Sequence, residues 1–133
     1  MYVYEGVEKI DPIEREKQHA LTKALWQQLG EMGIKTGDKG RIEGFFTSTS
    51  YEQAVKLQAS QDEDFKATVY EDEESPTYMI QITTPVVRLS VEALVELADI
   101  FMMSAVDTQT TFDGFQLDVN EIKKLNAPWW KIW

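Results

Sequence analysis

The sequence contains no cysteine and only one histidine. Without cysteine the chain has no disulfides, thiolate metal ligands or thiol nucleophiles, and this composition fits a reducing cytoplasm. The single histidine, His19, is the one imidazole available for acid–base or nucleophilic catalysis, and no carboxylate pair stands in an apolar setting to replace it. We therefore expect no enzymatic activity and no catalytic residues.

Motifs for phosphate and metal binding are missing as well. The stretch GDKGRIEG lacks both the Lys-Ser/Thr ending and the preceding strand of a phosphate-binding loop. No HExxH or EF-hand pattern occurs, and the acidic run at residues 71–74 lacks the alternate spacing with which a loop surrounds a cation. We expect no cofactor and no metal ion.

Long apolar runs are also absent. No run approaches the ~20 residues that a membrane-spanning helix needs. The first residues lack a basic region followed by an apolar one, so we expect no signal peptide. With 133 residues, 43% of them hydrophobic and 27% charged, the chain fits one soluble globular domain.

Positive charge is scarce: 13 Lys and Arg stand against 23 Asp and Glu, for a net charge of −10. Nucleic acid is bound by neutralising its phosphates, and no basic stripe is present for that purpose, so we expect no direct nucleic-acid binding. A basic protein surface is the better partner. Negative charge gathers in residues 62–74, whose candidate partner-binding carboxylates are Asp62, Glu63, Asp64, Glu71, Asp72, Glu73 and Glu74.

The first helix is predicted from Pro12 to about Gly30 or Gly33. Asp11 is a suitable N-cap, and Pro12 suits the first helical position. His19 lies mid-helix without a second ligand or nucleophile beside it, so we expect a surface or edge role for it. The predicted apolar face of this helix comprises Ile13, Ala20, Leu21, Ala24, Leu25 and Leu29.

Short strands and helices alternate over the rest of the chain. Apolar alternation predicts strands at 41–47, 65–70, 78–84 and 110–119, and helices capped by Ser50 and Ser90. The order β-α-β-β-α-β after a first helix indicates an α+β, ferredoxin-like split βαβ sandwich, with helices on one face of a four-stranded antiparallel sheet. We divide the chain into an N-terminal helix with lead-in (1–37), a ferredoxin-like domain (38–120) and a Trp-rich C-terminal tail (121–133).

The segment TTFDGFQLDV interrupts the last predicted strand with Asp113-Gly114. A regular strand would place Phe112 and Phe115 on opposite faces, and a bulge of one residue would bring them onto one face. The rival is a tight hairpin, because Asp-Gly is a strong turn pair. We prefer the bulge, with Asp113 either satisfying its backbone donors or contacting a partner.

The chain ends in PWWKIW, which is unusually aromatic. Trp129, Trp130 and Trp133 either pack on their own domain or anchor another molecule, including a second copy of this chain. A membrane surface is the weaker alternative, since few lysines lie nearby.

Residues 40–119 resemble the family of regulator of ribonuclease E activity B. The resemblance rests on Arg41 to Phe46 followed by YEQAVKL, on DFKATVYE, TYMIQITT and VEALVELADIF, and above all on FDGF at residues 112–115. This last motif is similar to the family's aromatic-Asp-Gly-Trp motif, with Phe115 in place of the usual Trp. PWWKIW stands where better-known members carry a long acidic tail.

The resemblance implies a cytoplasmic bacterial protein of ferredoxin-like fold that binds and inhibits ribonuclease E without catalytic residues of its own. Our main hypothesis is therefore a non-catalytic, protein-binding regulator of RNA degradation. The alternative is a small-molecule-sensing or enzymatic ferredoxin-like domain with a site near Asp113. Besides the acidic residues above, the candidate partner-binding residues are Phe112, Asp113, Phe115, Trp129, Trp130 and Trp133.

Overall fold

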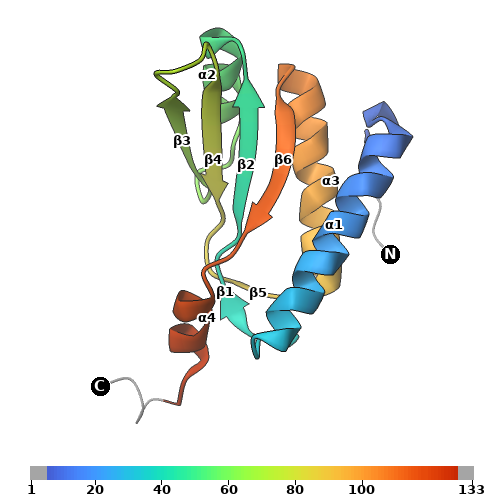
Figure 1. Ribbon diagram of the computed structural model, residues 1–133, viewed down its shortest axis with the longest axis vertical. Helices are drawn as coiled ribbons and strands as arrows, with labels where there is room; N and C mark the ends of the chain where they lie inside the picture. Colours follow the sequence, from blue (N-terminus) through green and yellow to red (C-terminus); the bar gives the residue numbers. More distant parts are fainter. Residues whose placement is uncertain (1–5, 129–133) are drawn as a thin grey trace.

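Four α-helices and two antiparallel sheets make up residues 6–128, the part of the chain that the computed structural model describes (Figure 1). A short 3₁₀-helix at Val7–Lys9 precedes α1 (Pro12–Glu31). Asp11 caps α1, because its Oδ1 accepts from the backbone N of Ile13 at 3.1 Å. The predicted start of this helix is confirmed.

The predicted apolar face of α1 is correct only in the second half of the helix. Leu29 is buried and Leu25 packs against the core, as predicted, but Ile13 is 79% exposed and Leu21 52% exposed. The first half of α1 docks through hydrogen bonds to α3 and β6 and buries Gln18 and Thr22 instead. Apolar spacing alone therefore did not identify the docking side of the first half.

The main sheet has the strand order β3-β4-β2-β6, and every neighbouring pair in it is antiparallel (Figure 1). Its strands are β2 (Glu43–Ser48), β3 (Lys66–Glu71), β4 (Tyr78–Thr83) and β6 (Thr111–Gln116). The β3–β4 hairpin occurs as predicted. Alternation in β2 buries Gly44, Phe46 and Ser48 on one face and leaves Glu43, Phe45 and Thr47 on the other.

Helices α2 (Tyr51–Ala59) and α3 (Val91–Thr108) cover the face that carries Phe46 (Figure 1). Both predicted serine caps are confirmed, with Ser50 Oγ accepting from Gln53 N at 3.3 Å and Ser90 Oγ from Ala93 N at 3.0 Å. The Phe46 and Phe101 rings meet edge to face at 5.3 Å between centroids. The core between this face and the helices is one continuous cluster.

The sequence did not predict the elements at the end of the main sheet that lies away from the β3–β4 hairpin. A two-residue ribbon pairs β1 (Lys39–Gly40) with β5 (Val87–Arg88), and α4 (Val119–Asn126) lies against β1. The last strand ends at Gln116 instead of residue 119, so the prediction of strand followed by tail is wrong here. Asp118 caps α4 by accepting from Glu121 N at 3.1 Å.

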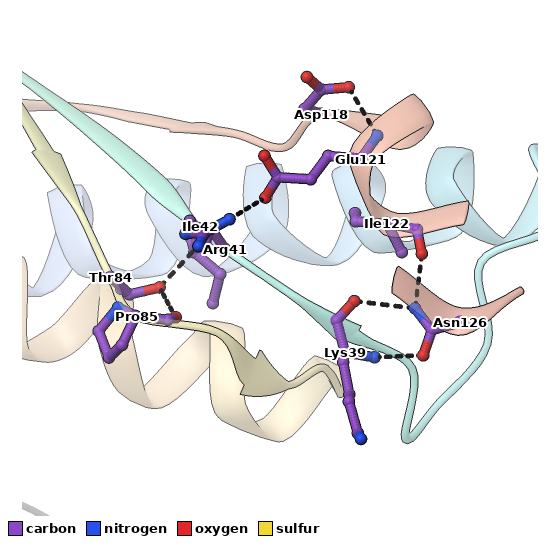
Figure 2. Close-up of polar contacts among 9 residues, drawn as sticks. All are labelled: Lys39, Arg41, Ile42, Thr84, Pro85, Asp118, Glu121, Ile122 and Asn126. Atoms are coloured by element: carbon purple, nitrogen blue, oxygen red, sulfur yellow. Dashed lines mark hydrogen bonds and ion pairs between the residues drawn. The ribbon is translucent and has the colours of Figure 1, made fainter. Parts of the chain in front are cut away.

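Asn126 fixes the end of α4 to β1 (Figure 2). The backbone N of Lys39 donates to Asn126 Oδ1 at 2.8 Å, and Asn126 Nδ2 donates to Lys39 O at 2.8 Å. Asn126 Nδ2 also donates to Ile122 O within α4 at 2.6 Å. The side-chain amide thus pairs with the backbone of β1 as a neighbouring strand would.

Candidate functional site

The structure divides the acidic segment at residues 62–74 into two groups. Asp62, Glu63 and Asp64 are exposed in the turn between α2 and β3. Glu71 ends β3, and the exposed residues 72–74 lie in the connection to β4. The six residues of β3 separate the two groups by roughly 20 Å. The segment therefore forms two acidic regions at opposite ends of an edge strand, not one patch.

Asp72 has a local role in the β3–β4 connection. Its Oδ1 accepts from Glu74 N at 2.9 Å, and its Oδ2 accepts from Ser75 Oγ at 3.2 Å. Its own backbone N donates to Thr77 O at 3.1 Å. This carboxylate organises the turn, and it holds the exposed Glu73 and Glu74 at the tip of the hairpin.

Asp113-Gly114 forms the predicted bulge. Phe45 of β2 pairs with Gly114, and the next residue, Phe46, pairs with Phe112, so Asp113 is the extra residue of β6. Gly114 has a φ of 121°, a region that favours glycine. The hairpin alternative is wrong, because β6 continues through both residues.

The bulge places both flanking rings on the core side of the sheet. The Phe112 and Phe115 centroids lie 5.1 Å apart, and each lies 5.8 Å from that of Phe101 on α3. Phe112 is only 4% exposed, and Phe115 is partly buried against the same cluster. These rings stabilise the contact between sheet and helix. Phe112 therefore does not present a surface to a partner.

Asp113 itself points outward, at the edge of the sheet. Partial burial raises the pKa of this carboxyl, the Thr47 hydroxyl on β2 lowers it, and the charge of Glu14 on α1 raises it. No Lys or Arg among residues 6–128 lies within ion-pair distance of it. Of the FDGF motif, Asp113 is the part that a partner can reach. Trp129, Trp130 and Trp133 lie outside the described residues.

The face of the main sheet opposite α2 and α3 is not covered by any other described element (Figure 1). We call it the uncovered face. Tyr70 is 49% exposed and Met79 45% exposed. The adjacency of Phe45 and Phe46 showed that they point to opposite faces, but no local signal showed which face would stay open. The residues of this face used below are Phe45, Thr47, Tyr70, Met79, Gln81 and Asp113.

A polar cluster joins α1 to α3. Arg15 Nε and Nη2 donate to the two carboxylate oxygens of Asp99 at 2.9 Å each, and His19 Nε2 lies 2.7 Å from Asp99 Oδ1. Burial raises the pKa of Asp99, but the hydrogen bonds and charges of Arg15 and His19 lower it overall. His19 lies partly exposed at the edge of the α1–α3 contact, with 20% of its side chain accessible, but its contact with Asp99 was not predicted.

Three carboxylates gather where β2 meets α4, and Figure 2 draws two of them, Asp118 and Glu121. Arg41 Nη1 donates to Glu121 Oε1 at 2.8 Å, next to the capping residue Asp118. Burial raises the pKa of Glu43 on the neighbouring strand, and the charges of Asp118 and Glu121 raise it further. Arg41 pairs with Glu121, and Lys66 of β3 lies in the same row as Glu43, so three carboxylates stand near two cations at this end of the uncovered face.

A surface hollow of about 460 Å³ lies between α1 and β6. Asp113, Gln18 and Phe112 are among its lining residues. Within the described part of the chain, no three His, Cys, Asp or Glu side chains are grouped so that they could hold a metal ion. None of the helices in residues 6–128 has the length and apolar character to cross a bilayer.

Comparison of the chain with protein-family models and with curated proteins gave no match.

Proposed function

We propose that this chain is a non-catalytic, protein-binding regulator of the ribonuclease E regulator B type, with a ferredoxin-like fold, in the bacterial cytoplasm. The fold assignment is supported by the order of the main strands across the sheet, which is second, third, first and fourth in chain order. Helices follow the first and third of these strands and cover one face. Both features are those of a split βαβ arrangement.

The observation that carries the proposal is the bulge at Asp113. It gives a physical reason for an aromatic-Asp-Gly-aromatic motif: both rings enter the core, Gly114 adopts a positive φ, and Asp113 is left outside. The resemblance to the regulator family depends most on this motif. A bulge with this geometry supports membership of the regulator family more strongly than the residue sequence FDGF does by itself.

The proposed mechanism is occlusion or remodelling of ribonuclease E through protein contact. The exposed carboxylates at both ends of β3 attract basic segments over distance. Partly exposed aromatic and apolar side chains then supply contact energy at short range. Binding would alter which proteins the RNA-degrading complex contains.

The test is retention of this protein on immobilised ribonuclease E from the same organism, at low and at raised salt. We expect retention at low salt that weakens as salt is added. No retention even at low salt would contradict the proposal.

A charge-matched pair of variants sharpens this test. The hairpin variant Glu71→Gln, Glu73→Gln, Glu74→Gln is expected to weaken binding about tenfold, through lost attraction near the contact. The control Glu16→Gln, Glu31→Gln, Glu52→Gln removes the same charge from exposed helix positions and is expected to weaken it less than about threefold. Equal effects would mean that only the net charge matters.

The alternative is a small-molecule sensor or enzyme with its site near Asp113. It is favoured by the hollow between α1 and β6 that includes Asp113 and Gln18. A small ligand that raises the melting temperature of the wild type but not of Asp113→Asn would support this alternative.

A further inference from the structure

Apolar side chains from three strands gather on the half of the uncovered face that lies nearer the β3–β4 hairpin. Tyr70 of β3 pairs with Met79 of β4, and Met79 pairs with Thr47 of β2, so these side chains form one row. In the next row Phe45 pairs with Gln81. Tyr70 and Met79 are each about half exposed. The face thus offers an aromatic and thioether surface that adapts well to an apolar group.

Beside Phe45, the bulge leaves open space. A Cβ added to Gly114 would have no neighbouring atom within 4 Å. Gly114 is the pairing partner of Phe45, and Asp113 stands next to it near Thr47. A side chain of another molecule can therefore approach the backbone here, next to a carboxylate without a cationic partner among residues 6–128.

Negative charge borders both ends of this surface. At the α4 end stand Glu43, Asp118 and Glu121, with Arg41 paired to the last of them. At the hairpin end stand the exposed carboxylates of Glu73 and Glu74, at the tip of the turn, whereas Glu71 pairs with Tyr78 and lies on the helix side of the sheet. Lys66 of β3 lies in the same row as Thr83 and Glu43, so it places one positive charge on the uncovered face near the α4 end. An occupant with positive charge at both ends and an apolar middle is complementary to this arrangement.

The size of the face limits what can occupy it. Four strands of six residues span roughly 300 to 400 Å², well below the ~800 Å² per partner of a stable protein pair. This area suits a short segment. A second copy of this chain, placed face to face, would oppose like carboxylates, and nucleic acid would bring phosphates to a negative border.

We propose that the uncovered face binds a short Arg- or Lys-rich protein segment whose central apolar residue packs on Phe45, Tyr70 and Met79. Cationic side chains of this segment pair with Asp113 and with the carboxylates at the two ends. This inference rests on the proposed protein-binding function and adds to it the surface and the chemistry of the bound segment.

The direct test is an NMR titration with a short synthetic peptide that has arginines at both ends and a central Leu-Trp pair. We expect shifts in the amides of β2, β3, β4 and the bulge, and no binding when the arginines are replaced by glutamates. A peptide with serines in place of Leu-Trp should bind about tenfold more weakly. Shifts confined to α2 and α3 would overturn the proposal.

Variants locate the contact. Met79→Arg is expected to weaken peptide binding at least about tenfold, and Asp113→Asn about threefold. The control Val55→Arg adds the same charge at a 37% exposed position of α2 and should bind like the wild type. Tyr70→Ser provides a second face variant if Met79→Arg folds poorly. Equal losses in Met79→Arg and Val55→Arg would overturn the proposal, as would occupation of the face by oligouridine or by a second copy.

Repeating the variants against ribonuclease E separates this inference from the proposed function. If ribonuclease E binds the wild type and Met79→Arg equally, the function stands and the proposed surface is wrong. If ribonuclease E does not bind but the arginine peptide shifts the face amides, the surface stands and the proposed partner is wrong.

Discussion

Gly44 of β2 lies directly against the Phe101 ring of α3. A Cβ at this position would collide with the Phe101 ring, including a distance of 2.7 Å to Cδ2, and that ring is held among other aromatic side chains. We expect Gly44→Ala to lower the free energy of unfolding by about 2–3 kcal/mol through overpacking. Urea denaturation measures the change.

The matched control is Gly30→Ala in α1. An added Cβ there meets no atom within 4 Å, so the higher helix propensity of alanine should raise stability by about 0.5–1 kcal/mol. If Gly44→Ala were as stable as the wild type, the Phe101 ring would have to be free to move away from Gly44, contrary to its packing among the other aromatic rings.

Asp99 couples the docking of α1 to pH. Since its pKa is lower in the folded state than the ~3.9 of an unfolded chain, its stabilising effect is complete above that value and is lost as pH falls through the lowered one. We expect Asp99→Asn to cost about 2 kcal/mol at pH 7 and progressively less below about pH 4. Urea midpoints measured at several pH values test this.

Asp107→Asn serves as the control for that series. Asp107 is exposed, and its contact with Lys9 is 4.0 Å long, so its removal should change stability by less than about 0.5 kcal/mol at any pH. A pH-independent deficit in Asp99→Asn would contradict the proposed linkage.

For individual residues, the sequence predicted the structure correctly where the interaction involves neighbours in the chain. Asp11, Ser50 and Ser90 cap helices as predicted, since a cap involves neighbours in the chain. The bulge was predictable because Phe112 and Phe115 must share a face. The Asp99–His19 contact was not, since its residues are 80 positions apart and only the tertiary fold brings them together.

Among the elements, α4 is attached to β1 by Ile122, which is buried beside Gly40, and by the side-chain amide of Asn126. Asn126 makes three hydrogen bonds, two with Lys39 and one with Ile122. We expect Asn126→Ala to cost about 1–2 kcal/mol and to accelerate amide hydrogen exchange at Lys39. Asn120→Ala, at an exposed position of the same helix, should leave that exchange unchanged. Unaltered exchange in Asn126→Ala would show that α4 is held by other contacts.

Two helices show where element prediction failed. In α4 the signal was present, because Asp118 and Glu121 have the spacing of a capping box, but the preceding strand was extended over it. In α1 the signal was incomplete, because the docking side presents Gln18 and Thr22 in addition to the predicted Leu25 and Leu29. A face that docks through hydrogen bonds to other elements carries no hydrophobic periodicity by which sequence could reveal it.

For the whole molecule, the division of the acidic segment into two separate regions affects how a basic partner is attracted to the surface. The sequence showed that carboxylates cluster in residues 62–74. It could not show that β3 would separate residues 62–64 from residues 71–74 by roughly 20 Å. It likewise could not show that one face of the sheet would lack a covering layer. Both properties arise from the packing of the complete chain.

This charge distribution predicts how the rates of binding depend on salt. With a net charge of −10, association with the arginine peptide should be electrostatically steered. Raising the salt concentration from about 0.05 to 0.5 M should slow association about tenfold and change dissociation less than about threefold. Stopped-flow fluorescence of the peptide Trp measures both rates. A salt effect mainly on dissociation would contradict steering.

The bulge in β6 also bears on aggregation. The edges of the main sheet are β3 and β6, and an open edge invites strands of other molecules to add to it. In β6 the extra residue Asp113 breaks the regular ladder, and Gln18 Nε2 donates to Phe112 O at 3.4 Å. At β3, carboxylates at both ends repel a like copy. With both edges protected in this way, strand addition by another molecule is disfavoured, even though the open face carries the half-exposed side chains of Tyr70 and Met79.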